Sequence, residues 1–371
     1  KCGRCSTRYC GPECQVQHWK EGGHDQLCKK IKKAGGAEQY NANQRYAEAV
    51  TVAAEACADD TNGQTCYICT QALHRKTKEG LVRMCACRGT AGLAHVSCLA
   101  EQAKILVAEA EENHLGSKAF NSRFQRWHHC SLCEQEYHGA VLCALGWACW
   151  KTYLGRPEAD ELRGLAMTNL GNGLSAADHD EEALMVREAE FSMLRRVGGS
   201  EISMLGSQSN LANSYHNIGR DDEALRLRRD NYSRWLKLCG EEHEHTLLAA
   251  NNYVLSLVTL QLSQEVKSVL RKTMPVARRV LGESHDSTLR MRVMYAAALC
   301  NDTDATLDDL REAVTTFEET ARIARRVLGS AHPIAVDIEG KVRRSREALR
   351  AREASESRVV DVTLSLIHIS E

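Results

Sequence analysis

The sequence has few of the features that mark several large classes of protein. Only 4 of its 371 residues are proline and 5% are aromatic, a composition that favours a largely helical protein over a β-sandwich. The formal net charge is −1, so no basic excess indicates a nucleic-acid partner. The longest apolar run, Gly139–Trp150, has about half of the roughly 20 residues that a membrane helix needs. We therefore expect that run to be buried, and we expect no membrane span.

Motifs of several enzyme classes are missing as well. We find no glycine-rich phosphate loop, no metal-ligand set with an open position, and no nucleophile paired with a general base. A secretory signal is also not visible. These absences direct attention to binding and assembly rather than to hydrolysis, oxidation or phosphoryl transfer.

Cysteine, in contrast, is abundant. The chain has 17 cysteines, most of them within the first 133 residues in closely spaced pairs interleaved with histidine. Zinc takes four such ligands in a tetrahedron and binds reduced thiolates. Because reduced thiols persist inside cells, the sequence predicts an intracellular zinc protein, cytoplasmic or nuclear.

Residues 1–33 hold the first group of ligands, in the order Cys-x2-Cys, Tyr-Cys-x3-Cys, His-Trp and His-x3-Cys. The last pair has i, i+4 spacing, which places both side chains on one face of a helical turn. The pattern resembles the C-terminal three-quarters of a MYND finger, a family with two interleaved zinc sites that binds short peptides. The resemblance implies one complete site and half of a second, hence one or two zinc ions. The complete site comprises Cys2, Cys5, His24 and Cys28, and the half site comprises Cys10 and Cys14.

Residues 64–150 hold a second group of eight ligands, in the pattern C-x2-C-x15-C-x-C-x7-H-x2-C-x31-C-x2-C. Eight ligands complete two tetrahedra with none left over. Such a cross-brace joins distant segments in a domain whose apolar core is small. Alternate pairing assigns Cys66, Cys69, His95 and Cys98 to one zinc ion, and Cys85, Cys87, Cys130 and Cys133 to the other.

The sequence around these ligands resembles that of the RING-CH, or RING-variant, family. The resemblance rests on the single residue between the third and fourth cysteines of the module, the histidine as fifth ligand, and the segments 85–90 and 95–99. A PHD finger is the alternative, but it normally has more residues between those cysteines and fewer before the histidine. The resemblance implies a ubiquitin ligase that docks a ubiquitin-conjugating enzyme through Ile68 and Leu99.

Two positions depart from the family pattern. The tryptophan expected shortly after Leu99 is absent, and Gln102 lies near its place. The residue after the last ligand, which is often basic, is Glu134. These departures favour a non-enzymatic scaffold as the alternative function. A chromatin reader is a third reading, but the module has few aromatic residues to build the cage that such a reader needs.

From about residue 158 to residue 350 the sequence repeats. Leu170, Leu211, Tyr253 and Tyr295 are spaced 41, 42 and 42 residues apart. Each unit has the apolar spacing of two amphipathic helices, which must stack on neighbouring units to bury their apolar faces. The pattern resembles tetratricopeptide repeats of the kinesin-light-chain type, and this implies a concave surface that binds a client protein or peptide. Our candidate groove residues are Asn172, Asn213, Asn252 and Arg292.

Together these patterns predict a mainly α protein, with small zinc-stabilised α/β modules followed by a helical tetratricopeptide-type solenoid. The favoured function is a zinc-dependent ubiquitin ligase whose repeats recruit the substrate. The last residues resemble translated sequencing-adapter sequence, so we expect an artefactual end. The expected divisions are a partial MYND-type finger at 1–33, a helical linker at 34–63, a RING-CH-type domain at 64–150, repeats at 158–350 and a disordered tail at 351–371.

Overall fold

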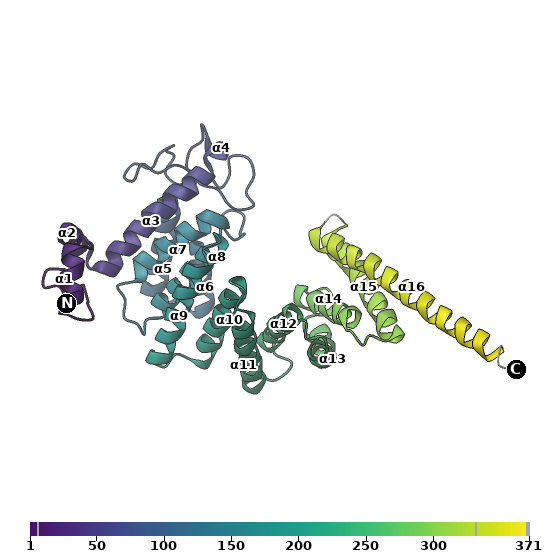
Figure 1. Cartoon of the computed structure of the whole chain (residues 1–371). Helices are drawn as coiled ribbons and strands as arrows, with labels where there is room; N and C mark the ends of the chain where they lie inside the picture. Colours follow the sequence, from purple (N-terminus) through teal and green to yellow (C-terminus); the bar gives the residue numbers. More distant parts are fainter. Residues whose placement is uncertain (6, 331, 369–371) are drawn as a thin grey trace. The chain divides into compact units, whose positions relative to one another are not determined.

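A computed structural model describes residues 1–5, 7–330 and 332–368 of the chain (Figure 1). Within these residues the backbone is mostly helical, and β structure is limited to two isolated antiparallel bridges, Val82 to Ala94 and His129 to Glu136. The predicted mainly α class is therefore confirmed. The chain divides into two compact units, Lys1–Ser207 and Gln208–Glu371, and each is described by itself.

The first unit joins the cysteine-rich segments to the first helix pair of the repeats. Helix α10 begins in this unit and continues into the second. The helices are α1 (Pro12–Lys20), α2 (His24–Ala34), α3 (Ala37–Ala56), α4 (Ala58–Thr61), α5 (Val96–Glu112), α6 (Ser117–Phe124), the 3-10 turn η1 (Gln125–Trp127), α7 (Gly139–Tyr153), α8 (Glu161–Ala176), α9 (Asp180–Val197) and α10 (Glu201–Asn217).

Helix α3 is more than the linker that the sequence predicts. Its buried residues Tyr46, Val50 and Ala53 belong to one apolar core, which also contains residues of α5 and α7 and the start of α8. The apolar run of α7 is buried as expected, but it packs against both α3 and α8. The expected divisions at residues 63 and 150 therefore do not separate compact units.

Helices α7 and α8 approach closely because glycines lie at their crossing. A Cβ atom on Gly173 would lie 2.7 Å from the carbonyl oxygen of Leu142, and one on Gly146 would lie 3.0 Å from that of Asn169. No side chain fits at such distances without a shift of the backbone. The first repeat is thus built directly onto the helix that follows the cysteine-rich domain.

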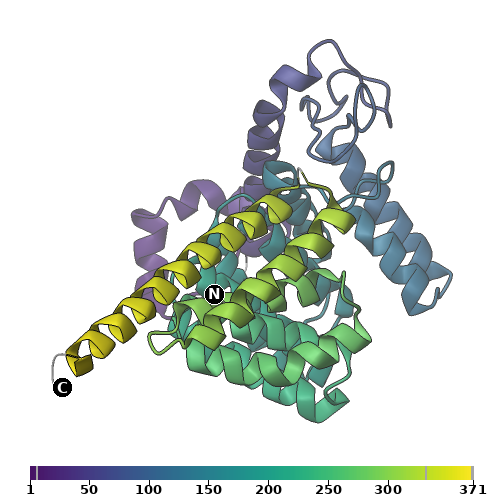
Figure 2. The ribbon, with the colours of Figure 1, turned by 90° about the vertical axis from the view of Figure 1, so that its right-hand side faces the viewer.

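The second unit consists of stacked helix pairs, which Figures 1 and 2 show as antiparallel neighbours. Leu211, Tyr253 and Tyr295 are buried in the first helices of successive units, as their spacing predicts. After α10, the helices are α11 (Asp221–Cys239), α12 (Glu244–Thr259), α13 (Ser263–Val280), α14 (Asp286–Asn301), α15 (Leu307–Leu328) and α16 (Pro333–His368).

Histidines cap three of these first helices. The Nδ1 atoms of His243, His285 and His332 each accept a hydrogen bond from the backbone N–H two residues later, at 3.2–3.3 Å. Such a bond satisfies one of the donors that a helix N-terminus leaves free. Helix α16 then runs to His368, through most of the segment predicted to be disordered, and residues 369–371 lie outside the described part of the chain.

Candidate metal centres and docking surfaces

The cysteines and histidines of the first unit converge in three groups of four. Within each group every residue offers one ligand atom, and these atoms all lie within 4.8 Å of one another. The grouping is the one that the sequence predicts. The groups are Cys2, Cys5, His24 and Cys28; Cys66, Cys69, His95 and Cys98; and Cys85, Cys87, Cys130 and Cys133.

The spacing of the ligand atoms fits zinc. Two sulfurs placed tetrahedrally about 2.3 Å from one ion are about 3.8 Å apart. The Sγ atoms of Cys2 and Cys28 are 3.8 Å apart, and those of Cys87 and Cys130 are 3.7 Å apart. Between Cys5 Sγ and His24 Nε2 the distance is 3.3 Å, as expected for a shorter zinc–nitrogen bond. The soft donor set and these distances suit a closed, four-coordinate ion.

The first centre of the 66–133 segment joins a tight turn to the start of α5. The backbone N–H of Cys69 donates to Cys66 Sγ at 3.5 Å. His95 precedes α5 and Cys98 lies in its first turn, so the helix start places both ligands. The Nε2 atom of His95 lies 3.3 Å from the carbonyl oxygen of Ala72, while its Nδ1 faces the sulfurs of Cys69 and Cys98 at 3.4 and 3.6 Å. This second contact orients the ring as a metal ligand requires.

The second centre joins residues that are more than forty positions apart in the sequence. Cys85 and Cys87 come from an irregular segment, and Cys130 and Cys133 from a tight turn after η1. Gly92 lies against this centre with φ +78°, and a Cβ atom there would lie 2.7 Å from the Cβ of Cys87. Only glycine meets both constraints.

Burial and hydrogen bonds shift the pKa values of these thiols in opposite directions. It raises the pKa of Cys87 to about 11 and raises the pKa values of Cys85 and Cys98 as well. Burial also acts to raise the pKa of Cys133, but hydrogen bonds from the Gln135 backbone and from neighbouring thiols lower that pKa to about 7. Because a metal binds thiolates, zinc binding must release protons from these sites.

The N-terminal centre lies at the start of α2. His24 is the first residue of that helix and Cys28 follows one turn later, both fully buried. Cys10 and Cys14 are exposed, with their Sγ atoms 2.7 Å apart, and they belong to no group of three or more potential ligands among the described residues. The structure therefore shows one complete ligand set and one isolated pair in this segment.

The two predicted docking residues differ in their exposure to solvent. Ile68 is 37% exposed on the turn between the first two ligands, as its role requires. Leu99 is only 3% exposed, because the first turn of α5 faces the core, so the prediction of a docking contact there is wrong. Sequence reasoning missed Leu132, which is 52% exposed on the turn between Cys130 and Cys133. Its position between two ligands, like that of Ile68, was the available signal.

The turns that carry Ile68 and Leu132 lie side by side. The hydroxyl groups of Tyr67 and Ser131 form a hydrogen bond of 3.1 Å between them. At the edge of the second turn, Glu134 accepts a hydrogen bond from Arg126 at 2.7 Å, and this bond lowers the pKa of Glu134 below its usual range. The negative charge at this departure from the family pattern is thus balanced within the domain.

Two of the predicted groove asparagines share one arrangement. Asn172 Oδ1 accepts a hydrogen bond from Arg187 at 3.0 Å, and Asn213 Oδ1 accepts one from Arg228 at 2.9 Å. In both cases the arginine follows the asparagine by 15 residues and is buried. Each guanidinium thus fixes the side-chain amide of its asparagine. The NH2 group of that amide can then donate to a ligand.

The other two groove candidates do not share that register. Asn252 directly precedes Tyr253, whereas Asn213 lies two residues after the equivalent Leu211. Arg292 is 4% exposed, and its guanidinium donates to three groups of its own chain, on Glu283, Glu319 and Thr320. Arg292 therefore ties α14 to α15, and the prediction that it lines a peptide groove is wrong.

Comparison with known proteins agrees with this geometry. Residues 66–133, from the first to the last of the eight clustered ligands, match the RING-variant domain. Residues 204–245 and 304–334 match the tetratricopeptide repeat. The chain contains a RING-variant domain and tetratricopeptide repeats. A search of curated proteins gave no match to this chain.

Solved structures also match this chain, at low sequence identity. Two crystal structures show nearly identical TPR-like repeats of a kinesin-light-chain-type protein from Podosopora anserina. They are 19% identical to this chain, cover 63% and 62% of it and 98% and 97% of their own chains, and have TM-scores of 0.43 and 0.42. BtubC (BKLC) from P. vanneervenii is 13% identical, with 73% of this chain and 92% of its own covered and a TM-score of 0.44. Among the described residues, no helix is both long and apolar enough to cross a membrane.

Proposed function

We propose that this chain is a zinc-dependent ubiquitin ligase. Its RING-variant domain docks a ubiquitin-conjugating enzyme, and its repeats recruit the substrate protein. The observation that most supports the proposal is the pair of exposed apolar side chains, Ile68 and Leu132, on two adjacent ligand-bearing turns. Such a ligase accelerates transfer by holding the loaded enzyme near an acceptor lysine.

Zinc would have a structural role in this mechanism. Each of the three ligand sets supplies four protein ligands, so an ion held there would be closed to water and substrate. The ion would fix the turns around Cys66 and Cys130 and thereby hold Ile68 and Leu132 in place. A third zinc ion would be held in a MYND-type site by the N-terminal set, Cys2, Cys5, His24 and Cys28.

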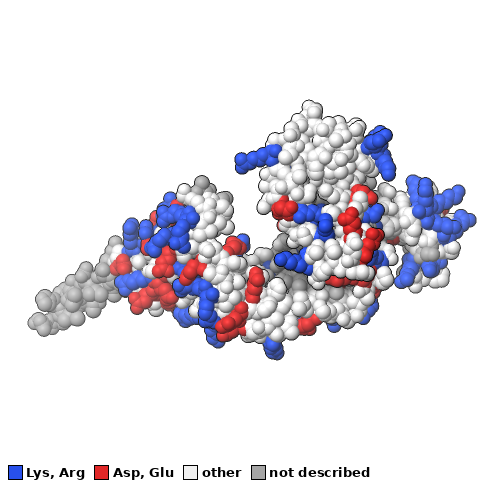
Figure 3. All heavy atoms as spheres, turned by 180° about the vertical axis from the view of Figure 1, so that it is seen from behind, with Lys and Arg blue, Asp and Glu red and all other residues white. Residues whose placement is uncertain are grey.

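The two proposed docking contacts are exposed apolar side chains. On the side shown in Figure 3, the RING-variant part of the first unit carries few charged side chains. A few side chains that become fully desolvated near the centre of such a contact contribute most of the binding energy. Ile68 and Leu132 are the side chains that would bind the conjugating enzyme.

The repeats are proposed as the client-binding part. Asn172 and Asn213 are held by buried arginines, so their amide groups are oriented before any ligand arrives. An oriented amide suits the backbone of an extended peptide, because it can donate to a peptide carbonyl.

A non-enzymatic scaffold is the second candidate. Gln102 stands in place of the family's tryptophan, and Glu134 in place of its basic residue. If those two positions are essential for ubiquitin transfer, the domain would dock a conjugating enzyme but transfer ubiquitin inefficiently.

The test is auto-ubiquitination of the purified, zinc-loaded chain with a panel of conjugating enzymes. We compare Ile68→Ala, Leu132→Ala and Cys66→Ala with the unchanged protein. Leu115→Ala is the matched control, because Leu115 has the same 37% exposure as Ile68 but lies in the turn after α5. We expect chains with the unchanged protein and with Leu115→Ala, at least about tenfold slower formation with either docking variant, and none with Cys66→Ala.

The opposite results would decide between the two functions. If zinc-loaded protein forms no chains with any enzyme, the ligase proposal is wrong and the scaffold remains. If Ile68→Ala and Leu132→Ala work as well as the control, the proposed docking face is wrong.

A further inference from the structure

The last two helices of the second unit enclose an open groove. Helices α15 and α16 run side by side, as Figures 1 and 2 both show, and a hollow of about 510 Å³ lies between them. Ala321 and Val342 are buried at its floor, whereas Val336 is 54% exposed at its rim. The remaining lining residues are Glu318, Arg322, Arg325, Glu339, Arg343 and Arg346.

The repeat register identifies what this groove corresponds to. Helices α14 and α16 are the first helices of successive units and begin at Asp286 and Pro333. Counted from those starts, Tyr295 corresponds to Val342, Ala296 to Arg343 and Leu299 to Arg346. In α14 these three positions are buried, and the hydroxyl of Tyr295 donates to Glu312 of α15, the second helix of the same unit. In α16 the matching face lines the open groove.

The opposite wall of the groove has the same correspondence. In two earlier units an arginine of the preceding second helix donates to the tyrosine 24 residues later, Arg229 to Tyr253 and Arg271 to Tyr295. The residue 24 positions before Val342 is Glu318 of α15, which lines the groove. Both walls therefore match the surroundings of a second helix. Helix α16 continues to His368, whereas α14 ends at Asn301 and is followed by its second helix, so α16 does not turn back into the groove at the length of α14.

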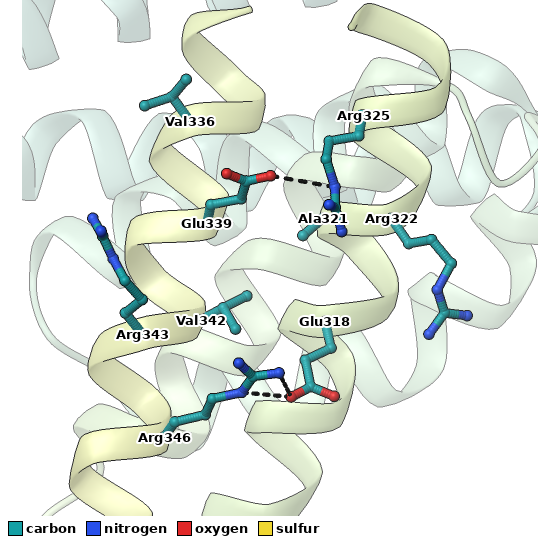
Figure 4. A pocket seen from close by; sticks show the side chains of 9 residues that line it. All are labelled: Glu318, Ala321, Arg322, Arg325, Val336, Glu339, Val342, Arg343 and Arg346. Atoms are coloured by element: carbon teal, nitrogen blue, oxygen red, sulfur yellow. Dashed lines mark hydrogen bonds and ion pairs between the residues drawn. The ribbon is translucent and has the colours of Figure 1, made fainter. Parts of the chain in front are cut away.

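Charge indicates what would fill the position. Two ion pairs bridge α15 and α16: Arg325 to Glu339 at 3.2 Å and Arg346 to Glu318 at 2.6 Å. Figure 4 shows these pairs between the helices, with Arg322 and Arg343 extending to either side. These two arginines have no acidic partner among the described residues, which leaves an excess of positive charge.

The earlier units show which charge a second helix brings to this position. The tyrosine hydroxyls of two units bond to a glutamate of the second helix, Tyr253 to Glu265 of α13 at 3.3 Å and Tyr295 to Glu312 of α15 at 2.9 Å. A helix with an apolar face matches the shape of the open position. Because Val342 and Glu318 stand where the earlier units have the tyrosine and the arginine, acidic residues on that helix would match Arg322 and Arg343 instead. Guanidinium groups bind carboxylates strongly, often through two parallel hydrogen bonds.

We propose that the α15–α16 groove is a docking site for an amphipathic, acidic α-helix of a partner protein. The partner helix takes the place of the second helix of a fifth repeat. Its apolar face covers Val336 and Val342, and its carboxylates pair with Arg322 and Arg343. A polar capping surface on the last helix would also carry charge. Such a surface alone does not explain a hollow with an exposed valine and two unpaired arginines. The site is independent of the proposed ligase activity.

The test uses the zinc-loaded full chain and three fluorescent 18-residue peptides. The first has leucine and alanine on one helical face and glutamate on the other. The second replaces every glutamate by lysine, and the third has the composition of the first in scrambled order. We expect saturable binding of the first peptide by anisotropy, with a gain of helical circular dichroism, and much weaker binding of the other two.

Variants locate the binding. Arg322→Glu with Arg343→Glu should weaken binding of the acidic peptide at least about tenfold and improve binding of the lysine peptide, because the charge of the groove is reversed. Arg350→Glu is the matched control, an exposed arginine of α16 outside the groove, and should change the affinity by less than about twofold. Thermal melting shows whether each variant is folded, and the alanine double variant replaces the glutamate one if that one is not.

Several results would overturn the proposal. The proposal is wrong if the acidic peptide does not bind, if the scrambled peptide binds equally well, or if reversal of the two arginine charges leaves the affinity unchanged. A concentration-dependent dimer in sedimentation, lost in the double variant, would assign the groove to a second copy of this chain instead.

Discussion

The two units of this chain are built on different physical principles. In the first unit, ligands that lie far apart in sequence meet in three centres, and one apolar core joins the cysteine-rich segments to α3, α7 and α8. In the second unit, the same local interactions recur every 42 residues, as in the pairs Arg229–Tyr253 and Arg271–Tyr295, and no ligand cluster is present among its described residues. One unit brings potential metal ligands together over long sequence distances, and the other depends on contacts between neighbouring helices.

The proposed functions are divided in the same way. A metal-braced turn holds an exposed apolar side chain such as Ile68 more rigidly than a loop of the same length can. Stacked helices instead provide extended surfaces for partners. The first helix pair of the repeats, α8 and α9, belongs to the first unit. The boundary between the two compact units therefore lies within the repeats.

The largest expected effect comes from removal of metal. A structural zinc site contributes about 10–16 kcal/mol in small fingers, comparable to the whole stability of a domain. Chelation should therefore abolish hydrogen-exchange protection in α5 and, through the shared core, in α3, α7 and α8. Protection of α12–α15 should persist. Loss of protection throughout the chain would remove the contrast between the units. Retention of protection in α5 would remove it as well.

The next largest effect is expected at the crossing of α7 and α8. Gly173→Val places side-chain atoms against the backbone of Leu142, so we expect a loss of at least about 3 kcal/mol in the free energy of unfolding of the first unit. Gly164→Ala is the control in the same helix, because no atom lies within 4 Å of a Cβ there. It should be neutral or stabilise by up to about 1 kcal/mol. Equal effects in chemical denaturation would show that the crossing is loose.

A smaller effect is expected in the second unit. Asp302 forms an ion pair with Lys267, and both side chains are buried. Asp302→Asn leaves the ammonium group of Lys267 without its charge partner, so we expect the melting transition of the second unit to fall by several degrees. Asp304→Asn, at an exposed carboxylate nearby, is the control and should have little effect.

The same ion pair predicts a pH dependence. Hydrogen bonding to Lys267 lowers the pKa of Asp302 below its ordinary value of 3.8, so the folded state binds this proton less readily than the unfolded state. The stabilisation is therefore present above that ordinary pKa and is lost as the pH falls below it. The difference in melting temperature between the unchanged protein and Asp302→Asn should shrink in acid. A constant difference from pH 7 to pH 3 would contradict this account.

The smallest effect tests the periodicity itself. Tyr253→Phe and Tyr295→Phe each remove a hydroxyl that bonds to an arginine and a glutamate of neighbouring helices. Each should cost about 0.5–1.5 kcal/mol in urea denaturation. Because the two networks are equivalent, we expect the two losses to agree within about 0.5 kcal/mol, and a large difference would mean that the repeats are not energetically equivalent.

The sequence predicts what depends on regular spacing. Ligand spacing identifies the two groups within residues 66–133, because zinc accepts few residue types in few patterns, and the resemblance to a MYND finger implies the group within residues 1–33. The 41- and 42-residue period identifies the repeats and their buried positions, Tyr253 and Tyr295 among them. Both signals can be read from spacing in the sequence and need no knowledge of the tertiary fold.

Features that depend on packing could not be predicted in this way. The burial of Leu99 follows from the direction in which α5 faces, and the ties of Arg292 follow from contacts with another helix. The close crossing at Gly173 depends on α7, which lies about thirty residues earlier in the chain. Leu132 could have been found, since it lies between two ligands as Ile68 does.

The most direct test of the central claim, that three closed zinc centres organise the first unit, is native mass spectrometry of the purified chain. The account predicts three zinc ions per chain, one for each ligand set, with none added by Cys10 and Cys14. Cys28→Ala should reduce the count to two, and Cys10→Ala should leave it at three. A folded, unchanged first unit that holds fewer than three zinc ions would contradict the account.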